Sequence, residues 1–422
     1  MRAMVINRGV QPETIQTALA FFERSSLDFY VTSSSFGKDH FILKYLKQFF
    51  PESKFTNFFL RRVIDLPETK IYRKYFFLEL LARFLTFQRV SFFLRQVDGF
   101  LLKRKASKLL IQIKSDLLVS QDSLGNDVIK ALQVIHSKSI LTVSAAPPQV
   151  FNEIHELERS KSPDWFKYYP KHLYSRRFIR NYLKDLNSAS IVTAPSSFVA
   201  EQIKRFATPQ DLQVIPLGQF HENLGVTSND IVSRKILRKP CDPLKCIYVG
   251  QVHQRKGIGY LLEGFEDADL PMGSSVTLVG GIDKKLRKYI ESQFGFVKIL
   301  GHKSRSELGS LYRSHDVFIF PSLIEGFSLS VIEALSSGIP VISTQIALGD
   351  LLQDKHNCLI IADRSRESIS NTLEWFNSHP REIEIIRKNA IKVGNRYIWS
   401  NYRQNFISVA NSLFVNSPGE VQ

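Results

Sequence analysis

The sequence predicts an α/β fold of doubly wound parallel sheets, and three observations predict it. Short apolar or β-branched runs alternate with longer helical patterns along most of the 422 residues, as is typical of βαβ units. At roughly 150 residues per domain, this length allows two or three domains. Glycine-rich or charged loops follow several predicted strands, at the sheet edge where ligands bind in such folds.

The composition excludes several classes of protein. Hydrophobic residues make up 44% of the chain and charged residues 23%, which is ordinary for a globular protein. No apolar run approaches the ~20 residues that a membrane span needs, and the first residues, MRAMVINRG, lack the apolar core of a secretory signal. Three cysteines (Cys241, Cys246 and Cys358) form no disulfide or zinc-binding pattern. We therefore expect a cytoplasmic protein with no membrane-spanning helix.

The first domain is expected over residues 1–218. Strands are predicted near residues 3–7, 28–32, 117–120, 139–143 and 190–193, and helices near 12–23, 126–135 and 197–206. Residues 67–114 show no clear turns and are interpreted as a helical insertion. A polar stretch that runs from Gly218 to Lys239-Pro240 marks the domain boundary.

The second domain, expected over residues 219–394, has the clearer pattern. Six buried strands are predicted at residues 246–249, 275–279, 297–300, 317–320, 341–344 and 358–361. A helix or a glycine-rich turn follows each of them, which predicts a doubly wound sheet.

The net charge of +16 is concentrated in the first half of the chain. Residues 1–220 carry about +13, and between Lys38 and Lys108 the basic residues alternate with Phe and Tyr. Three interpretations remain open: Lys and Arg solvate the outer faces of helices, they face an anionic membrane surface, or they hold an acidic acceptor. A nucleic-acid partner is not expected, because no zinc finger, helix-turn-helix or RNA-binding aromatic motif is found.

A pair of glutamates follows the strand that ends at Phe320. Glu325 is predicted on a loop at the carboxyl edge of the sheet, and Glu333 on the second turn of a helix that begins near Ser328. Gly326 would let the backbone approach a ligand closely, and free amides at the helix start would attract an anion. The alternative is a solvated loop acid at Glu325 and a partly buried helix residue at Glu333.

Two further loops carry candidate anion-binding groups. Gly250 follows a strand, and the loop after it contains Arg255 and Lys256, either of which could meet a pyrophosphate. Of these two residues, we expect Arg255 to be simply exposed to solvent and Lys256 to contact a ligand. Gly280-Gly281 follows the next strand and is by itself a weak signal, since many βα turns use glycine.

Together with Leu300-Gly301-His302 and Asp316–Ser322, these segments resemble glycosyltransferase family 4 (glycosyl transferases group 1), including its E-x7-E signature. The resemblance covers residues 214–415 closely and the first half more loosely. It implies the GT-B fold, in which two Rossmann-like domains face each other across a cleft. It also implies that a final helix, about residues 395–415, packs back on the first domain.

The resemblance further implies a role for each site residue. Glu333 would bind the ribose hydroxyls of the donor, Glu325 the hydroxyls of the transferred sugar, and Lys256 the diphosphate leaving group. The remaining donor-binding positions are Gly326, Phe327, Ser328, Leu329, Gly250, Gln251, Arg255, Gly280, Gly301 and His302, and Gly9 lies on the acceptor-side loop. The donor is a nucleoside-diphosphate sugar and the acceptor a saccharide or a lipid-linked saccharide. Transfer would retain the anomeric configuration without metal or cofactor, in surface polysaccharide or glycolipid synthesis.

The chain departs from the family pattern in both halves. Gln251 stands where the family usually has Arg, and Ser328 where it usually has Gly. The segment 144–148 lacks the histidine that many relatives place there, and His155 and His172 are expected to be ordinary helix residues. These departures keep a second hypothesis open, that of a non-catalytic donor-binding or assembly subunit with the same fold.

Overall fold

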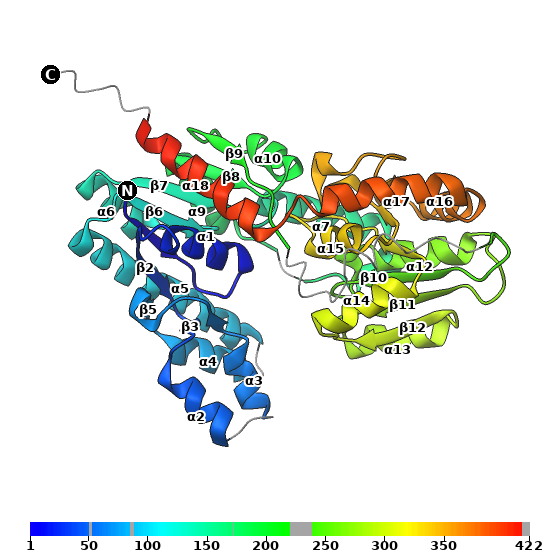
Figure 1. The fold of residues 1–422 in the computed structure, drawn as a ribbon, viewed down its shortest axis with the longest axis horizontal. Helices are drawn as coiled ribbons and strands as arrows, with labels where there is room; N and C mark the ends of the chain where they lie inside the picture. The colour runs from blue at the N-terminus through cyan, green and yellow to red at the C-terminus, as the bar shows by residue number, and fades with distance from the viewer. Residues whose placement is uncertain (50–52, 85–87, 172, 220–238, 416–422) are drawn as a thin grey trace.

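The computed structural model describes residues 1–49, 53–84, 88–171, 173–219 and 239–415 (Figure 1). Within these ranges the chain forms two parallel sheets in separate lobes, each flanked by helices. The predicted fold class is confirmed.

The first sheet has seven parallel strands in the order β5-β2-β1-β6-β7-β8-β9. The order reverses between β1 and β6, so the sheet has a switch point there. Its strands are β1 (Ala3–Ile6), β2 (Leu27–Thr32), β5 (Ile71–Arg73), β6 (Leu117–Gln121), β7 (Lys138–Thr142), β8 (Ile191–Ala194) and β9 (Leu212–Val214). A separate two-stranded ladder joins β3 (Phe36–Gly37) and β4 (Val63–Ile64).

The helices of the first half are α1 (Pro12–Phe22), α2 (Phe41–Phe49), α3 (Lys54–Leu60), α4 (Phe76–Phe84), α5 (Gln88–Ile113), α6 (Asn126–Ile135), α7 (Pro148–Lys161), α8 (Pro163–Phe166), α9 (Arg176–Ser188) and α10 (Ser197–Lys204). In the part of the chain that the structure describes, no helix is both long and apolar enough to cross a bilayer.

The expected insertion over residues 67–114 differs from the structure in two respects. It contains strand β5, which pairs with β2 at the edge of the first sheet. The second half of α5 also belongs to the core of the domain, since Leu102, Ala106 and Leu110 are fully buried against the sheet. Helical structure outside the sheet begins earlier than expected, at α2 and α3, which precede residue 67.

The second sheet has six parallel strands in the order β12-β11-β10-β13-β14-β15. Its switch point lies between β10 and β13. The strands are β10 (Lys245–Val249), β11 (Ser275–Val279), β12 (Val297–Gly301), β13 (Val317–Phe320), β14 (Val341–Ser343) and β15 (Leu359–Ile360). The helices that follow are α12 (Ile258–Asp267), α13 (Lys284–Gln293), α14 (Arg305–Ser314), α15 (Leu329–Ser337), α16 (Arg366–Ser378), α17 (Pro380–Gly394) and α18 (Trp399–Val415).

Helix α18 crosses from the second lobe back to the first (Figure 1). There it packs on α1, where the hydroxyls of Thr17 and Tyr402 are 2.9 Å apart. The two connections between the lobes run side by side, since Gln219 and Ile398 form a parallel bridge. Residue 218 needs to be glycine at this crossing, because a Cβ there would lie 2.4 Å from the carbonyl carbon of Ile398. The segment from 220 to 238, next to the predicted domain boundary, is outside the described residues.

Helices α7 and α8 precede residue 218 but pack on the second lobe. The Trp165 indole lies against Gly259 and donates a 2.7 Å hydrogen bond to Glu263. The buried carboxylate of Glu158 accepts hydrogen bonds from Gln254 at 2.9 Å and Arg364 at 3.0 Å. The two lobes are therefore joined by an apolar contact and a buried polar network.

Candidate active site

The strongest candidate site lies at the switch point of the second sheet. Strands β10 and β13 are neighbours there, and the loops that follow them carry Lys256 and Glu325. Gly257, at φ +73°, lets the two loops touch, because a Cβ at this position would lie 2.0 Å from the Pro321 carbonyl oxygen. The crevice outside adjacent strand ends is where doubly wound sheets bind ligands.

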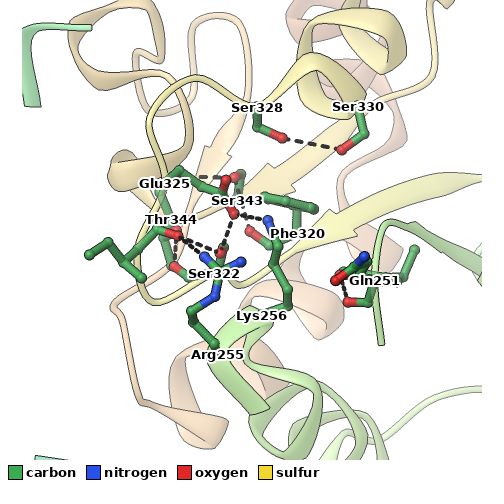
Figure 2. Close-up of polar contacts among 12 residues, drawn as sticks. Gln251, Arg255, Lys256, Phe320, Ser322, Glu325, Ser328, Ser330, Ser343 and Thr344 are labelled. Carbon is green, nitrogen blue, oxygen red and sulfur yellow. Dashed lines mark hydrogen bonds and ion pairs between the residues drawn. The ribbon is translucent and has the colours of Figure 1, made fainter. Parts of the chain in front are cut away.

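Lys256 and Glu325 form an ion pair in this crevice (Figure 2). Both side chains are about nine-tenths buried, with 13% and 11% of their surfaces exposed. Ser322 donates a 2.5 Å hydrogen bond to the same carboxylate oxygen of Glu325. The Lys256 ammonium also lies 5.1 Å from the centre of the Phe320 ring, which attracts a cation.

The charges around Glu325 keep it ionised. Burial disfavours its charged form, but the charges of Lys256 and Arg255 and the hydrogen bonds from Lys256 and Ser322 outweigh that cost. The net effect holds the pKa of Glu325 below its ordinary value. A carboxylate and an ammonium are thus held together at this edge of the sheet, able to accept from hydroxyls and to donate to phosphate oxygens respectively.

Arg255 supports the Glu325 loop from its other side. Its guanidinium donates a 3.2 Å hydrogen bond to the Ile324 carbonyl and lies 5.8 Å from the Phe151 ring of α7. It is partly buried, so the expectation that it is merely exposed is wrong. The exposed Gln251 lies on the loop after β10, where its carbonyl accepts a 2.8 Å hydrogen bond from Tyr248.

Glu333 lies on α15, the helix that starts directly after Ser328 and ends at a left-handed Gly338, as the sequence predicts. Ser328 precedes the helix without a side-chain capping hydrogen bond, its hydroxyl lying 3.1 Å from that of Ser330. The Glu333 carboxylate is 4.0 Å from the Arg305 guanidinium of α14. Burial raises the pKa of Glu333 to about 7, although Arg305 opposes the shift.

Glycines at neighbouring strand ends form the wall next to β10. Gly280 adopts φ +139°, and a Cβ there would lie 1.9 Å from the Gly250 carbonyl oxygen. The next strand, β12, ends at Gly301, which adopts φ +69°. The ring of the following residue, His302, lies close to Gly281, since a Cβ on that glycine would be 3.1 Å from the His302 Nε2. The structure therefore brings the glycine segments of three loops to one edge of the sheet.

Gly326 has a different neighbour from the one expected. A Cβ at Gly326 would lie 1.8 Å from the carbonyl oxygen of Ser144, which follows β7 in the first lobe. Ser196, also of the first lobe, donates a 2.7 Å hydrogen bond to the Gly326 carbonyl. The glycine is therefore required by the close approach of the other lobe, a contact that the sequence did not indicate.

The segment that meets Gly326 is held by a residue that the sequence did not single out. Asp122, at the end of β6 with φ +57°, accepts hydrogen bonds from the backbone amide of Ser144 at 2.9 Å and from its hydroxyl at 2.8 and 2.9 Å. The predicted Gly9 lies at the switch point of the same sheet, after β1, where its amide donates to Asn7 at 3.0 Å. No motif links Asp122 to Ser144 in the sequence, so only the parallel pairing of β6 with β7 reveals their contact.

Two histidines were considered near the cleft. His155 is buried in α7 against the rings of Phe166 and Tyr169, as expected of an ordinary helix residue. His172 lies outside the described residues. His253, which the sequence analysis passed over, precedes the Lys256 turn, and its burial, together with the nearby cations Arg255 and Lys256, lowers its pKa to about 3. Across the described ranges, no group of three His, Cys, Asp or Glu side chains is placed to hold a metal ion.

Comparison with known proteins agrees with this geometry. Residues 243–377 match the family model described as glycosyl transferases group 1. An uncharacterised glycosyltransferase of Methanocaldococcus jannaschii is 27% identical over 241 residues, which cover 54% of this chain and 61% of that protein. The putative teichuronic acid biosynthesis glycosyltransferase TuaC of Bacillus subtilis is 29% identical over 204 residues, covering 48% of this chain and 51% of its own length. The match thus spans about half to three fifths of these relatives.

A solved structure resembles the whole chain. Anabaena HepE, crystallised with UDP, superposes with a TM-score of 0.63 at 16% sequence identity, covering 98% of this chain and 100% of its own. The fold is therefore that of the GT-B glycosyltransferases. The region that matches the group 1 glycosyltransferase model, residues 243–377, includes both loops of the candidate site.

Proposed function

We propose that the protein transfers a sugar from a nucleoside-diphosphate sugar to a saccharide or lipid-linked acceptor, with retention of configuration and without a divalent metal. The observation that carries this proposal is the Lys256–Glu325–Ser322 group at the switch point, with Glu333 on the helix that follows. A cation, an ionised carboxylate and the N-terminus of a helix therefore lie close together. They would bind the phosphate charges and the hydroxyls of a sugar diphosphate.

The donor would be held by groups that the described chain already orients. The Lys256 ammonium has three N–H donors, so it can bond a phosphate oxygen while it remains paired with Glu325. The amides of Phe327 and Leu329 at the start of α15 would supply further positive potential for the diphosphate, whereas the Ser328 amide already donates a 2.9 Å hydrogen bond to the Ala347 carbonyl. Glu333, once ionised, would accept hydrogen bonds from the ribose hydroxyls.

Sugar transfer needs the leaving group to be stabilised as its charge develops. The bond between the anomeric carbon and the phosphate oxygen breaks, and the acceptor oxygen forms its new bond on the same face of the sugar. The acceptor proton passes to an oxygen of the departing phosphate, so the nucleoside diphosphate leaves with that proton. Lys256 and the helix amides would stabilise this charge in place of a metal ion, and Glu325 would hold the sugar through its hydroxyls.

The names of similar proteins support a nucleotide-sugar donor and a polysaccharide product. HepE has been crystallised with UDP and with UDP-glucose. An O-antigen chain mannosyltransferase of Escherichia coli is 26% identical over 169 residues, and TuaC is named for teichuronic acid biosynthesis.

The proposal is tested by incubating the purified full chain with UDP-, GDP- and ADP-sugars, EDTA, and a bacterial lipid and polysaccharide extract. We expect one donor to release its nucleoside diphosphate and to label an acceptor, and we expect Glu325→Ala to abolish both. Donor binding without release, with any acceptor fraction, would instead favour the non-catalytic donor-binding subunit. Activity that appears only after Mg²⁺ or Mn²⁺ replaces EDTA would contradict the metal-independent mechanism.

A further inference from the structure

The helical lobe, defined as residues 36–49 and 53–84, carries a stripe of exposed aromatic side chains. Phe41, Tyr45 and Phe49 recur at every fourth position of α2 and are 73%, 63% and 58% exposed. The opposite face of α2 is buried, since Leu43 and Leu46 pack in an apolar cluster of the lobe. The stripe is therefore a second apolar face of α2, separate from the face that holds the helix in place.

Helix α4 adds exposed apolar side chains to the same lobe. Phe77 and Leu81, one helical turn apart, are 66% and 37% exposed, while the adjacent Phe76 packs into the cluster that holds α2. On α2 the rings of Tyr45 and Phe49 stack at 5.8 Å. Single exposed apolar residues are normal on a protein surface, but contiguous ones, as along α2, mark an interaction site.

The charge of this region identifies the kind of partner. Lys44, one turn after Phe41 on α2, and Arg61 are exposed. By sequence, residues 41–62 contain five basic residues against the single acid Glu52: Lys44, Lys47, Lys54, Arg61 and Arg62, of which Arg62 is buried. A stripe of aromatic rings flanked by cations is typical of helices that lie in the headgroup layer of a membrane. Anionic lipids attract such segments by about 1 kcal/mol per Lys or Arg near the surface.

The position of the stripe fits a planar partner. Figure 1 shows α2 at the outer end of the helical lobe, which extends below the first sheet, whereas the second lobe lies to the right of that sheet. A symmetric contact between two copies through this face would bring the same cations together, which is unfavourable. A lipid layer with anionic headgroups and an apolar interior avoids this repulsion between like charges.

We propose that α2 and α4 of the helical lobe form a docking surface for an anionic lipid layer. Phe41, Tyr45 and Phe49 would lie among the headgroups, and Lys44 would pair with lipid phosphates. The docking is independent of the proposed sugar transfer, because it can be measured with no nucleotide sugar present. If transfer also occurs, a lipid-linked acceptor would be met at the same surface.

The test is sedimentation of the full chain with phosphatidylglycerol vesicles and with phosphatidylcholine vesicles. We expect binding to the anionic vesicles alone, weakened by salt. The triple variant Phe41→Ser, Tyr45→Ser, Phe49→Ser should lower the partition coefficient at least about tenfold. Ile385→Ser is the matched control, because this residue of α17 is 63% exposed and apolar but lies in the second lobe.

A second variant protects the test against misfolding of the triple variant. Lys44→Glu changes one exposed side chain and should lower binding to anionic vesicles about fivefold or more at low salt. The proposal is overturned if the wild type sediments equally with and without anionic vesicles, or if Lys44→Glu binds as tightly as Ile385→Ser. It is also overturned if the wild type is a dimer that the triple variant splits while vesicle binding is unchanged.

Discussion

The carboxyl edges of the two sheets have the same topology but different chemistry. Each sheet reverses its strand order at a central pair, β1 with β6 in the first and β10 with β13 in the second. At the second edge the functional groups follow one another within short motifs, as Glu325 and Glu333 do. At the first edge Glu13, Lys103 and Asp122 come from separate elements, and none belongs to a motif.

Under the proposed function, the difference follows from what each edge would bind. Ribose and diphosphate are common to all nucleotide sugars, so the same residue types at the same spacing would serve every donor. An acceptor has no such common part, and the first edge instead contains buried groups with altered ionisation. Burial raises the pKa of Glu13 to about 7 and lowers that of Lys103 to about 8. The second edge can therefore be identified from sequence, whereas the first needs a structure.

The largest effect is expected from Glu325→Ala. Removal of the carboxylate takes away the sugar-binding acceptor and leaves Lys256 buried without its partner. We expect turnover to fall about 10³-fold, as when an essential preorganised polar group is lost. Circular dichroism and the thermal midpoint of Glu325→Gln, which keeps the shape of the side chain, separate this effect from misfolding. Full activity in both variants would remove Glu325 from the site.

Lys256→Met should have the next largest effect. The variant keeps the length of the side chain but removes the charge that would face the diphosphate, so we expect kcat to fall about 10²-fold. Arg255→Met is the comparison, because Arg255 bonds the Ile324 carbonyl and would act through the loop. Steady-state kinetics of nucleotide release measures both. An equal loss in the two variants would contradict the assignment of Lys256 as the leaving-group cation.

A third prediction concerns the contact between the lobes. Gly326→Ala would force a Cβ to within 1.8 Å of the Ser144 carbonyl, so the lobes must separate or the Glu325 loop must move. We expect a loss of roughly 2 kcal/mol of stability, seen as a thermal midpoint about 4 to 8 °C lower. Gly295→Ala is the control, because a Cβ at Gly295 would meet no atom within 4 Å. Equal midpoints for the two variants would show that the lobes do not meet at Gly326 in solution.

The smallest effect is a pH dependence that originates in Glu333. With its pKa near 7, the carboxylate is mostly protonated at pH 6 and mostly ionised at pH 8. Because the ionised form accepts hydrogen bonds from ribose more strongly, nucleotide affinity should rise up to about tenfold over this range. The nucleotide phosphate titrates near pH 6 as well, so Glu333→Gln, which retains only the phosphate effect, is the control. A wild-type profile identical to that of Glu333→Gln would contradict the role of Glu333.

The same raised pKa affects stability in the opposite direction. The native state binds the Glu333 proton more tightly than the unfolded state does, so its contribution is fully present below about pH 4.5 and is lost as the pH rises through 7. Because Glu333→Gln resembles the protonated side chain at every pH, the thermal midpoints of the wild type and the variant should agree at low pH, and the wild type should fall below the variant as the pH rises through 7. A difference between the two midpoints that does not change with pH would contradict the raised pKa of Glu333.

Much of the fold was predictable because strand periodicity is local. All six strands of the second sheet were predicted, within about one residue at most ends, since each is a short buried run bounded by glycine or polar residues. The edge strand β5 was missed because three residues carry too little periodicity to be distinguished from the helices around them. The lobe contacts of Trp165 and Glu158 were missed because their partners lie about 100 residues or more away.

The candidate site, like the fold, was predictable where its residues belong to local motifs, and not where they depend on contacts between distant segments. Lys256 and Glu325 were found through their motifs, but their direct pairing depends on the adjacency of β10 and β13, which the sequence does not state. Ser322 and Arg305 were not singled out, since neither residue type is distinctive at its position. The contact of Gly326 with Ser144 joins two domains, and no local pattern indicates it.

The central claim is that the E-x7-E segment forms a nucleotide-sugar site, and calorimetric titration tests it most directly. The full chain and Glu333→Ala would each be titrated with UDP, GDP and ADP and with their common sugar conjugates, in EDTA. The account predicts that the wild type binds one nucleotide series and that Glu333→Ala loses this binding while remaining folded. Absence of binding to every nucleotide, or equal binding by the two proteins, would contradict it.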